Sequence, residues 1–329
     1  MKIAINGFGR IGRAAAKIIT GRTQMELVAI NDLTDVPTLA HLLKYDSCYG
    51  TWKCEVGYDE GDILIEKQRI HAYAEKDPAL LPWRELGIDI VLECTGHFLT
   101  TKDAGAHLKA GAKKVILSAP PKDETPMYVM GVNAGKYDGE NIVSNASCTT
   151  NCIAPVMKVL EDEFGIEKSL MSTIHSYTAD QNLVDGPHKD LRRARAAGMN
   201  IVPTSTGAAK AAYKTVPALE GKFDGIALRV PTPVVSLSDI TAVLKKNVTV
   251  EDINKAFKSA EKGVMSGFLA TTDEQLVSID FRGSQFSTIV DLSLTQVVGD
   301  NLVKVIAWYD NEWGYSERLV DLAELINKR

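Results

Sequence analysis

The most constraining feature is a glycine-rich loop set between two apolar runs near the start of the chain. In KIAINGFGRIGR, the glycines Gly7, Gly9 and Gly12 have the spacing G-x-G-x-x-G, and an Ala- and Ile-rich stretch follows them. A second apolar run, MELVAIND, ends at Asp32. This order predicts a dinucleotide-binding βαβ unit, whose glycines let a pyrophosphate approach the helix N-terminus. The alternative is a tight βα turn with Asp32 capping the next helix.

Asp32 also indicates which dinucleotide would bind. A carboxylate there can accept hydrogen bonds from ribose hydroxyls, each contributing about 1–3 kcal/mol. It would repel a 2′-phosphate by about 4 kcal/mol per unit charge, at ~4 Å separation and an effective dielectric constant of ~20. Because the repulsion is larger, we expect NAD rather than NADP.

The alternation of strands and helices continues after this unit. DIVLECTG predicts a strand ending at Thr95 and Gly96, KDAGAHLKAG a helix, and KKVILSAP another strand followed by Ser118. Ligands bind at the carboxyl ends of the strands in such sheets, so these loops are candidate contacts on the nicotinamide side. Cys94 is expected to be a small core residue of its strand.

The segment SNASCTTNC, residues 144–152, is followed by an amphipathic stretch. Ser147 is expected to cap a helix and Cys148 to lie in its first turn. The helix N-terminus favours a thiolate there, and its N–H groups can bind an oxyanion. Cys152 is expected to be structural, with a redox pair with Cys148 as the alternative.

A base and anion sites are expected further along. MSTIHSYTADQ delivers His175 after a strand-like run, and a Cys–His pair both activates the thiol and accepts its proton. The basic run HKDLRRARAAG is interpreted as a solvated helix or a subunit contact. Thr206 and Gly207 open a small-residue helix, and Arg229 suits bidentate phosphate binding.

Composition excludes several classes of protein. The chain has 329 residues, enough for two domains, and its formal net charge of −5 argues against a nucleic-acid binder. No apolar run reaches the length of a membrane span. The five scattered cysteines lack zinc-type spacing, so we expect no metal and a reducing, cytoplasmic setting.

Seven motifs together resemble the phosphorylating glyceraldehyde-3-phosphate dehydrogenase family. They are INGFGRIGR, SNASCTTNC, HSYT followed by DQ, HKDLRRARAA, TGAAKA, RVPTP and WYDNEWGYS, and they occur in order over essentially the whole chain. The resemblance implies an α/β fold with an NAD-binding Rossmann domain over 1–147, completed by a C-terminal helix at about 312–329. It also implies an α+β catalytic domain with a mixed or antiparallel sheet over 148–311, and a homotetramer acting in glycolysis and gluconeogenesis.

The resemblance further implies a chemistry. The thiolate of Cys148 would attack the aldehyde of glyceraldehyde 3-phosphate, and His175 would take the hydroxyl proton as hydride leaves for NAD. Inorganic phosphate would then attack the thioester to give 1,3-bisphosphoglycerate. The implied NAD contacts are Gly7, Gly9, Arg10, Ile11, Gly12, Asp32, Lys76, Ser118 and Asn311, with Leu33 and Pro187 as in NAD-preferring members. The implied substrate and phosphate contacts are Ser147, Thr149, Thr178, Arg193, Thr206, Gly207 and Arg229.

A few residues depart from the family pattern, and three other functions stay open. Pro121 stands where a small residue is usual, and Tyr49, Trp52 and Cys54 occupy a segment that usually differs. An erythrose-4-phosphate dehydrogenase would use water in place of phosphate. A non-catalytic NAD-binding scaffold would need no nucleophile, and a thiol hydrolase would need neither the glycine loop nor a nicotinamide.

Overall fold

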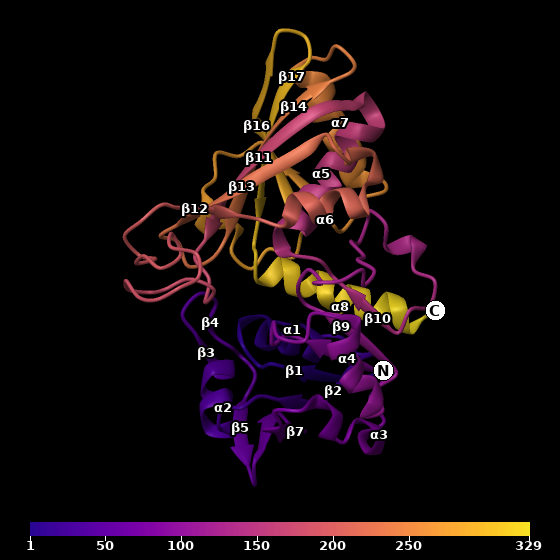
Figure 1. Cartoon of the computed structure of the whole chain (residues 1–329), viewed down its shortest axis with the longest axis vertical. Helices are drawn as coiled ribbons and strands as arrows, with labels where there is room; N and C mark the ends of the chain where they lie inside the picture. Colours follow the sequence, from indigo (N-terminus) through magenta and orange to yellow (C-terminus); the bar gives the residue numbers. More distant parts are fainter. The chain divides into compact units, whose positions relative to one another are not determined.

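The computed structural model describes residues 1–329, which divide into two compact units (Figure 1). The first unit comprises Met1–Tyr128, Lys136–Ala146 and Ser316–Arg329, and the second comprises Val129–Gly135 and Ser147–Tyr315. Each unit is built around its own large sheet. No helix is both long and apolar enough to cross a bilayer.

The first unit contains an eight-stranded sheet in the order β10-β9-β8-β1-β2-β7-β6-β5. Neighbouring strands from β10 to β7 are parallel, whereas β6 and β5 continue the sheet in antiparallel pairing. Its strands are β1 (Lys2–Asn6), β2 (Glu26–Asn31), β5 (Val56–Asp59), β6 (Asp62–Ile65), β7 (Gln68–Tyr73), β8 (Ile90–Glu93), β9 (Lys114–Leu117) and β10 (Ile142–Ser144), and the hairpin β3 (Tyr45–Asp46) and β4 (Gly50–Thr51) lies apart. Its helices are α1 (Arg10–Thr20), α2 (Val36–Lys44), α3 (Trp83–Leu86), α4 (Thr101–Lys109) and α8 (Trp313–Asn327).

The parallel part of this sheet has the sequence character of a doubly wound fold. The central strands β1, β2 and β8 are buried almost throughout, as expected for parallel strands covered on both faces. The strands and helices predicted for the first half of the chain all occur, although β8 ends at Glu93 and not at the predicted Thr95. The closing helix α8 also belongs to this unit from Ser316 onward, and it buries Leu319, Leu322 and Ile326.

The second unit contains a mixed seven-stranded sheet in the order β12-β13-β11-β14-β17-β16-β15. Two neighbouring pairs, β11 with β13 and β15 with β16, are parallel, and the others are antiparallel. Its strands are β11 (Ile166–Ser176), β12 (Val202–Ser205), β13 (Phe223–Val230), β14 (Ser236–Leu244), β15 (Leu269–Thr272), β16 (Thr288–Val298) and β17 (Leu302–Tyr309), and its helices are α5 (Cys148–Phe164), α6 (Ala208–Thr215) and α7 (Val250–Lys262).

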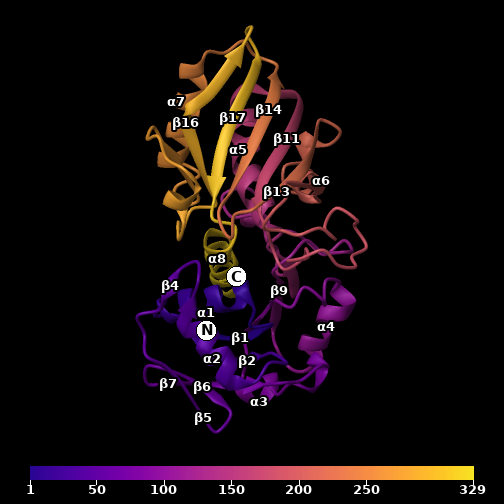
Figure 2. The ribbon, with the colours of Figure 1, turned by 90° about the vertical axis from the view of Figure 1, so that its left-hand side faces the viewer.

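Helix α5 packs on one face of this sheet, and Figure 2 shows it behind the strands. The opposite face is open, because residues along β11 alternate between buried and exposed. Leu170 and Ile226 are exposed on that open face. The sheet is therefore mixed, as the resemblance implied, and one of its faces carries apolar side chains in contact with solvent.

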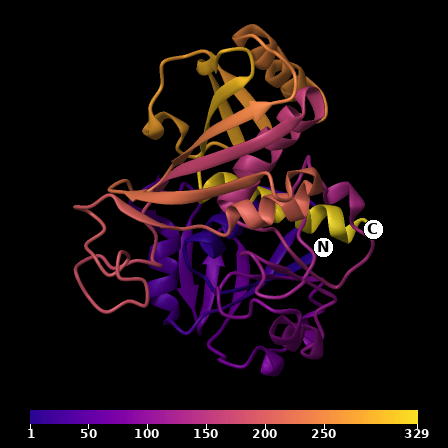
Figure 3. The same cartoon turned by 45° about the horizontal axis from the view of Figure 1, so that its top comes forward.

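The basic run lies in an irregular loop between β11 and β12. Residues 177–201 form turns and bends with no helix (Figure 3). Arg195 pairs with Asp185 at 3.0 Å, and Arg193 with Asp190 at 3.5 Å. Of the two interpretations of this run, the solvated helix is wrong, because these side chains stabilise local turns instead of continuous helical hydrogen bonding. The subunit contact stays a prediction.

Candidate functional site

The predicted dinucleotide loop borders a cavity of about 370 Å³ in the first unit. The cavity is formed at the carboxyl ends of β1, β2 and β8, where parallel sheets bind ligands. It is lined by Asn6, Gly7, Gly9, Asn31, Asp32, Leu33, Glu75, Lys76, Cys94, Thr95, His97 and Phe98. The structure thus brings together four of the predicted cofactor contacts, namely Gly7, Gly9, Asp32 and Lys76.

The three glycines differ in what their missing side chains allow. Gly7 has φ +92°, and a Cβ there would lie 2.6 Å from the backbone nitrogen of Thr95. A Cβ on Gly12 would lie 2.2 Å from the carbonyl oxygen of Gly7. At Gly9, by contrast, a Cβ would have no neighbouring atom within 4 Å. At Gly7 and Gly12 the loop lies directly against other backbone atoms, whereas at Gly9 there is free space in front of it. This arrangement suits a pyrophosphate bound at the start of α1.

The side chains near this loop are fixed by the protein. Asp32 accepts hydrogen bonds from the N–H groups of Phe8, at 2.8 Å, and Thr34, at 3.0 Å. It does not cap the next helix, because Asp35 does so by accepting from the N–H of Thr38. That alternative for Asp32 is therefore wrong.

Arg10 can offer its backbone N–H to a phosphate at the first turn of α1, while its side chain pairs with Asp46 at 2.9 Å. Tyr49 packs on the guanidinium of Arg10 and Trp52 on the ammonium of Lys17. Two of the residues that depart from the family pattern therefore contact side chains of α1.

Cys94 corrects an expectation from the sequence. Strand β8 ends at Glu93, so Cys94 and Thr95 lie in the following loop and border the cavity. Burial raises the pKa of Cys94 to about 12, against a hydrogen bond from Ser118 that lowers it. Cys94 is thus a neutral thiol in the cavity wall, and Ser118 supports it from outside the cavity lining.

In the second unit, α5 and β11 bring a thiol and an imidazole together. Ser147 caps α5 by accepting a hydrogen bond from the N–H of Thr150 at 3.0 Å, as predicted. Cys148 is the first residue of the helix, and its Sγ lies 3.5 Å from Nε2 of His175. The residue before the cap, Ala146, has φ +55°, a strained conformation for a residue with a side chain.

The tautomer of His175 follows from its second hydrogen bond. Nδ1 lies 2.7 Å from the carbonyl oxygen of Ser176, which can only accept. Nδ1 therefore carries the proton, and Nε2 presents a lone pair to the sulfur of Cys148. This is the arrangement that a general base for the thiol requires.

Burial controls the protonation of both groups. It raises the pKa of the Cys148 thiol, against the charge of Arg229 and hydrogen bonds from Thr149 that lower it. It lowers the pKa of His175 to about 3, and the charge of Arg229 acts in the same direction. The helix N-terminus and His175 were expected to favour a thiolate, whereas burial favours the neutral thiol. Because the imidazole is neutral, Nε2 can accept the thiol proton when the sulfur reacts.

Sequence comparisons agree with this arrangement. A model of the glyceraldehyde 3-phosphate dehydrogenase C-terminal domain matches residues 147–311, and one of the NAD binding domain of the same family matches residues 1–101. The chain belongs to the glyceraldehyde 3-phosphate dehydrogenase family.

Several curated relatives carry that name. A glyceraldehyde-3-phosphate dehydrogenase of Mycobacterium avium is 55% identical over 336 residues, with 100% of this chain and 99% of the relative covered. Glyceraldehyde-3-phosphate dehydrogenase 1 of Bacillus cereus is 53% identical over 330 residues, covering 100% of this chain and 99% of the relative. The chloroplastic enzyme GAPB of Arabidopsis thaliana is 56% identical over 333 residues, covering 99% of this chain and 74% of the relative.

Three of the residues that the glyceraldehyde-3-phosphate dehydrogenase resemblance assigned to phosphates, Arg229, Thr178 and Arg193, lie near Cys148 and His175 or act on them electrostatically. The guanidinium of Arg229 donates to the hydroxyl of Thr178 at 3.0 Å and to the carbonyl of Ser176 at 3.1 Å. The charge of Arg193 also lowers the pKa of His175, and Arg193 donates to the hydroxyl of Thr204 at 2.9 Å.

Thr206 lies elsewhere in the second unit. It borders a larger groove of about 1060 Å³ beside β13 and α6, which contains neither Cys148 nor His175. Gly207 precedes α6 without a side-chain cap.

Two buried side chains, Tyr309 and Cys152, lie near Cys148. The hydroxyl of Tyr309 lies 3.0 Å from that of Thr149 and 2.8 Å from that of Thr173. Cys152 is fully buried, and burial raises its pKa to about 12. Cys152 is therefore a structural thiol, as expected, whereas the contact between Thr149 and Tyr309 was not predicted because it joins residues far apart in the chain.

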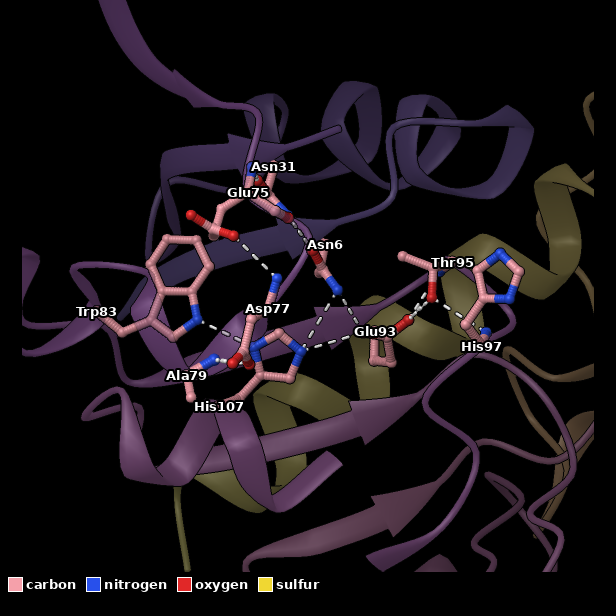
Figure 4. Close-up of polar contacts among 10 residues, drawn as sticks. All are labelled: Asn6, Asn31, Glu75, Asp77, Ala79, Trp83, Glu93, Thr95, His97 and His107. Carbon is pink, nitrogen blue, oxygen red and sulfur yellow. Dashed lines mark hydrogen bonds and ion pairs between the residues drawn. The ribbon is translucent and has the colours of Figure 1, made fainter. Parts of the chain in front are cut away.

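A buried polar network lies behind the cofactor cavity, and the sequence did not reveal it (Figure 4). The carboxylate of Glu93 accepts from Asn6 Nδ2 at 2.6 Å, from the backbone N–H of Thr95 at 2.8 Å and from the hydroxyl of Thr95. His107 Nε2 lies 3.0 Å from the same carboxylate. The indole N–H of Trp83 points at His107 Nδ1 at 3.0 Å. Since an indole only donates, Nδ1 accepts and Nε2 carries the proton toward Glu93.

This network generates a stability prediction. Glu93→Gln places an amide NH₂ where four donors converge on a buried carboxylate, so at least one donor loses its acceptor. We expect the free energy of unfolding to fall by about 1–3 kcal/mol, measured by denaturant unfolding. Glu85→Gln, at an exposed position two residues from Trp83, is the matched control. Equal stability of the two variants would contradict the view that all four hydrogen bonds to the Glu93 carboxylate stabilise the fold.

The electrostatics of the thiol generate a second prediction. Arg229→Ala removes a positive charge that lowers the pKa of Cys148, so that pKa should rise and less thiolate should form at a given pH. The rate of alkylation of Cys148 should therefore reach its midpoint at a higher pH than in the wild-type protein. Arg195→Ala, which removes an exposed arginine in the loop after β11, should leave the profile in place. A profile unmoved by Arg229→Ala would show that the guanidinium does not act on the sulfur.

Proposed function

We propose that this chain catalyses the NAD-dependent oxidative phosphorylation of glyceraldehyde 3-phosphate to 1,3-bisphosphoglycerate, in glycolysis and gluconeogenesis. The observation that carries the proposal is the Cys148–His175 pair, in which an unprotonated Nε2 lies 3.5 Å from the sulfur. A thiol with its own base forms covalent acyl intermediates, which is the chemistry needed to pass an oxidised aldehyde to phosphate.

Each proton in the proposed reaction has a place to go. Nε2 of His175 takes the thiol proton as Sγ of Cys148 attacks the aldehyde carbon. The oxyanion forms beside the N–H groups at the start of α5 and takes up that proton, giving a hemithioacetal. Nε2 then accepts the hydroxyl proton while the carbon loses hydride. Bound NAD would supply the hydride acceptor. Inorganic phosphate attacks the resulting thioester and loses its proton to solvent. The sulfur leaves as a thiolate and takes the proton held on Nε2 of His175, which returns both groups to their starting state.

The NAD contacts in this proposal follow the cavity of the first unit. The N–H groups of Arg10 and Ile11 at the start of α1 suit the pyrophosphate, and Gly9 leaves room for it. Asp32 suits the ribose hydroxyls. Lys76, Ser118 and Asn311 are proposed as further contacts, the last with the nicotinamide carboxamide.

The phosphate contacts are assigned by charge and position. Arg229 and Thr178, joined by a hydrogen bond of 3.0 Å, would hold the substrate phosphate. Ser147, Thr149, Arg193, Thr206 and Gly207 are proposed to surround the attacking phosphate. Thr206 borders a different groove, and both Thr206 and Gly207 are assigned from the family resemblance.

A homotetramer in the cytoplasm is also proposed. The open face of the second unit's sheet exposes Leu170 and Ile226, and exposed apolar faces of this kind favour self-association. All five cysteines are free thiols, which suits a reducing compartment.

The reaction has a direct test. NADH formation from glyceraldehyde 3-phosphate is expected to require inorganic phosphate for sustained turnover, because phosphate resolves the thioester. Cys148→Ser should abolish turnover, and His175→Asn should slow it by roughly 10²–10⁴-fold. Turnover indifferent to phosphate would favour the water-using erythrose-4-phosphate dehydrogenase, and absence of turnover with NAD bound would favour a scaffold.

The cofactor preference tests Asp32. Phe8 and Thr34 donate to different oxygens of Asp32, so Asp32→Asn keeps an acceptor for only one of these N–H groups. It also removes the charge that repels a 2′-phosphate, and comparing two cofactors on the same variant separates this effect from any general weakening. We expect the ratio of kcat/KM for NAD over NADP to fall by at least about 10-fold, which corresponds to about 1.4 kcal/mol. Steady-state kinetics with both cofactors measure the ratio. An unchanged ratio would remove Asp32 from the selection of the cofactor.

A further inference from the structure

The carboxamide of Asn311 is held by two serines that the proposed mechanism does not use. Asn311 follows β17 and is largely buried. Its Oδ1 accepts hydrogen bonds from the hydroxyl of Ser176, at 2.9 Å, and from the hydroxyl of Ser236, at 3.0 Å. Its Nδ2 donates to no protein group. This nitrogen is also not one of the buried side-chain atoms that lack a hydrogen-bond partner, so it is accessible at the molecular surface.

The hydrogen-bond balance fixes which end of the amide faces the serines. The hydroxyl of Ser236 already accepts from the backbone N–H of Ser176 at 3.1 Å, and both hydroxyls are buried. Each hydroxyl proton needs an acceptor, and Oδ1 of Asn311 supplies it for both. A rotated amide would place an NH₂ group against the two hydroxyls and leave both protons without an acceptor, which costs free energy in a buried site.

The sheet holds the two serines at a fixed distance from Asn311. Ser176 ends β11 and Ser236 begins β14, which pairs with both β11 and β17. Ser236 lies opposite Tyr309, two residues before Asn311. The preceding residue, Val235, has φ +68°, which is costly for a β-branched side chain. Strain of this kind persists where the surrounding structure dictates the backbone, here at the residue that places the Ser236 hydroxyl.

Ser176 connects this amide to the catalytic base. Its carbonyl oxygen accepts from Nδ1 of His175 at 2.7 Å, while its hydroxyl donates to Asn311. One residue thus sets both the tautomer of the base and the direction of the amide. A ligand held by Nδ2 of Asn311 would therefore be placed by the same backbone that places Nε2 of His175.

We propose that Ser176 and Ser236 are positioning residues that make Asn311 present a hydrogen-bond donor, so that the site selects the carbonyl oxygen of the nicotinamide carboxamide. The inference rests on the proposed function, in which Asn311 contacts that carboxamide. A donor fixed in this way favours a pyridine ring bearing a C=O group over one bearing a poor acceptor. Orientation of the ring then follows from one hydrogen bond whose direction the protein has already set.

Binding of cofactor analogues tests the inference without turnover. Dissociation constants of the full-length protein are measured by calorimetry for NAD⁺, for its 3-acetylpyridine analogue, which keeps the carbonyl, and for its thionicotinamide analogue, whose sulfur is a poor acceptor. The variants are Ser176→Ala, Ser236→Ala, the double variant and Asn311→Ala. Ser238→Ala is the matched control, because Ser238 is fully buried on the same strand as Ser236 and contacts Cys152 instead.

The expected result is a change in preference rather than a uniform loss. The wild-type protein and Ser238→Ala should favour both carbonyl-bearing cofactors over the thionicotinamide analogue. Each single serine variant should lower that preference by about 3-fold to 10-fold, and the double variant by at least about 10-fold, as expected when a buried hydrogen bond is lost. Thermal unfolding and the rate of Cys148 alkylation without cofactor report whether the fold and the catalytic pair stay intact.

Three outcomes would overturn the inference, and they differ in what else they contradict. Equal weakening of all three cofactors would show general loosening of the site. An unchanged preference in the serine variants, with a lowered one in Asn311→Ala, would show that Asn311 needs no positioning, and the proposed function would stand. An unchanged preference in Asn311→Ala would also remove Asn311 from the proposed cofactor contacts.

Discussion

The chemistry of the second unit depends on the hydrogen bond from Nδ1 of His175 to the carbonyl of Ser176, 2.7 Å long. A carbonyl can only accept, so this bond decides which ring nitrogen carries the proton. With the proton on Nδ1, the lone pair of Nε2 faces the sulfur of Cys148. In the opposite tautomer the ring would present a second proton to the thiol and could not act as its base.

Burial then sets the condition under which this base works. Because the surrounding protein partly removes the thiol and the imidazole from water, both groups favour their neutral forms. The charge of Arg229 lowers the pKa of Cys148, against the effect of burial, and it lowers the pKa of His175, in the same direction as burial. The guanidinium therefore keeps Nε2 available at neutral pH while lowering the free energy of a thiolate formed by proton transfer. In the proposed reaction the thiolate therefore forms by proton transfer within the pair, with the charge of Arg229 favouring it.

The sequence predicts those parts of the structure that depend on local geometry. Gly7 and Gly12 are required because any side chain would collide with backbone, and such a requirement is visible in the spacing. The cap at Ser147 is likewise local, so Cys148 at the start of a helix could be predicted. Cys94 was placed wrongly because the end of β8 differs by only a few residues from the expectation.

Contacts between distant residues escape that kind of prediction. The Asn311 amide is fixed by hydroxyls 135 and 75 residues away, and their approach depends on the pairing of β11, β14 and β17. The helix considered for the basic run is absent, because Arg195 pairs with Asp185, ten residues away, and only the folded loop brings these two residues together.

The buried polar groups around Glu93 and around Asn311 differ in whether they leave a hydrogen-bonding group free to bind a ligand. Around Glu93 every acceptor site meets a donor, and the histidine and indole continue the chain of hydrogen bonds into the core. Such a closed network can hold the wall of a cavity but has nothing left to offer a ligand. Around Asn311 only the oxygen is satisfied, and the protein leaves the NH₂ group toward solvent. A polar group that is fixed at one end and open at the other can select a ligand, because its direction is determined before the ligand arrives.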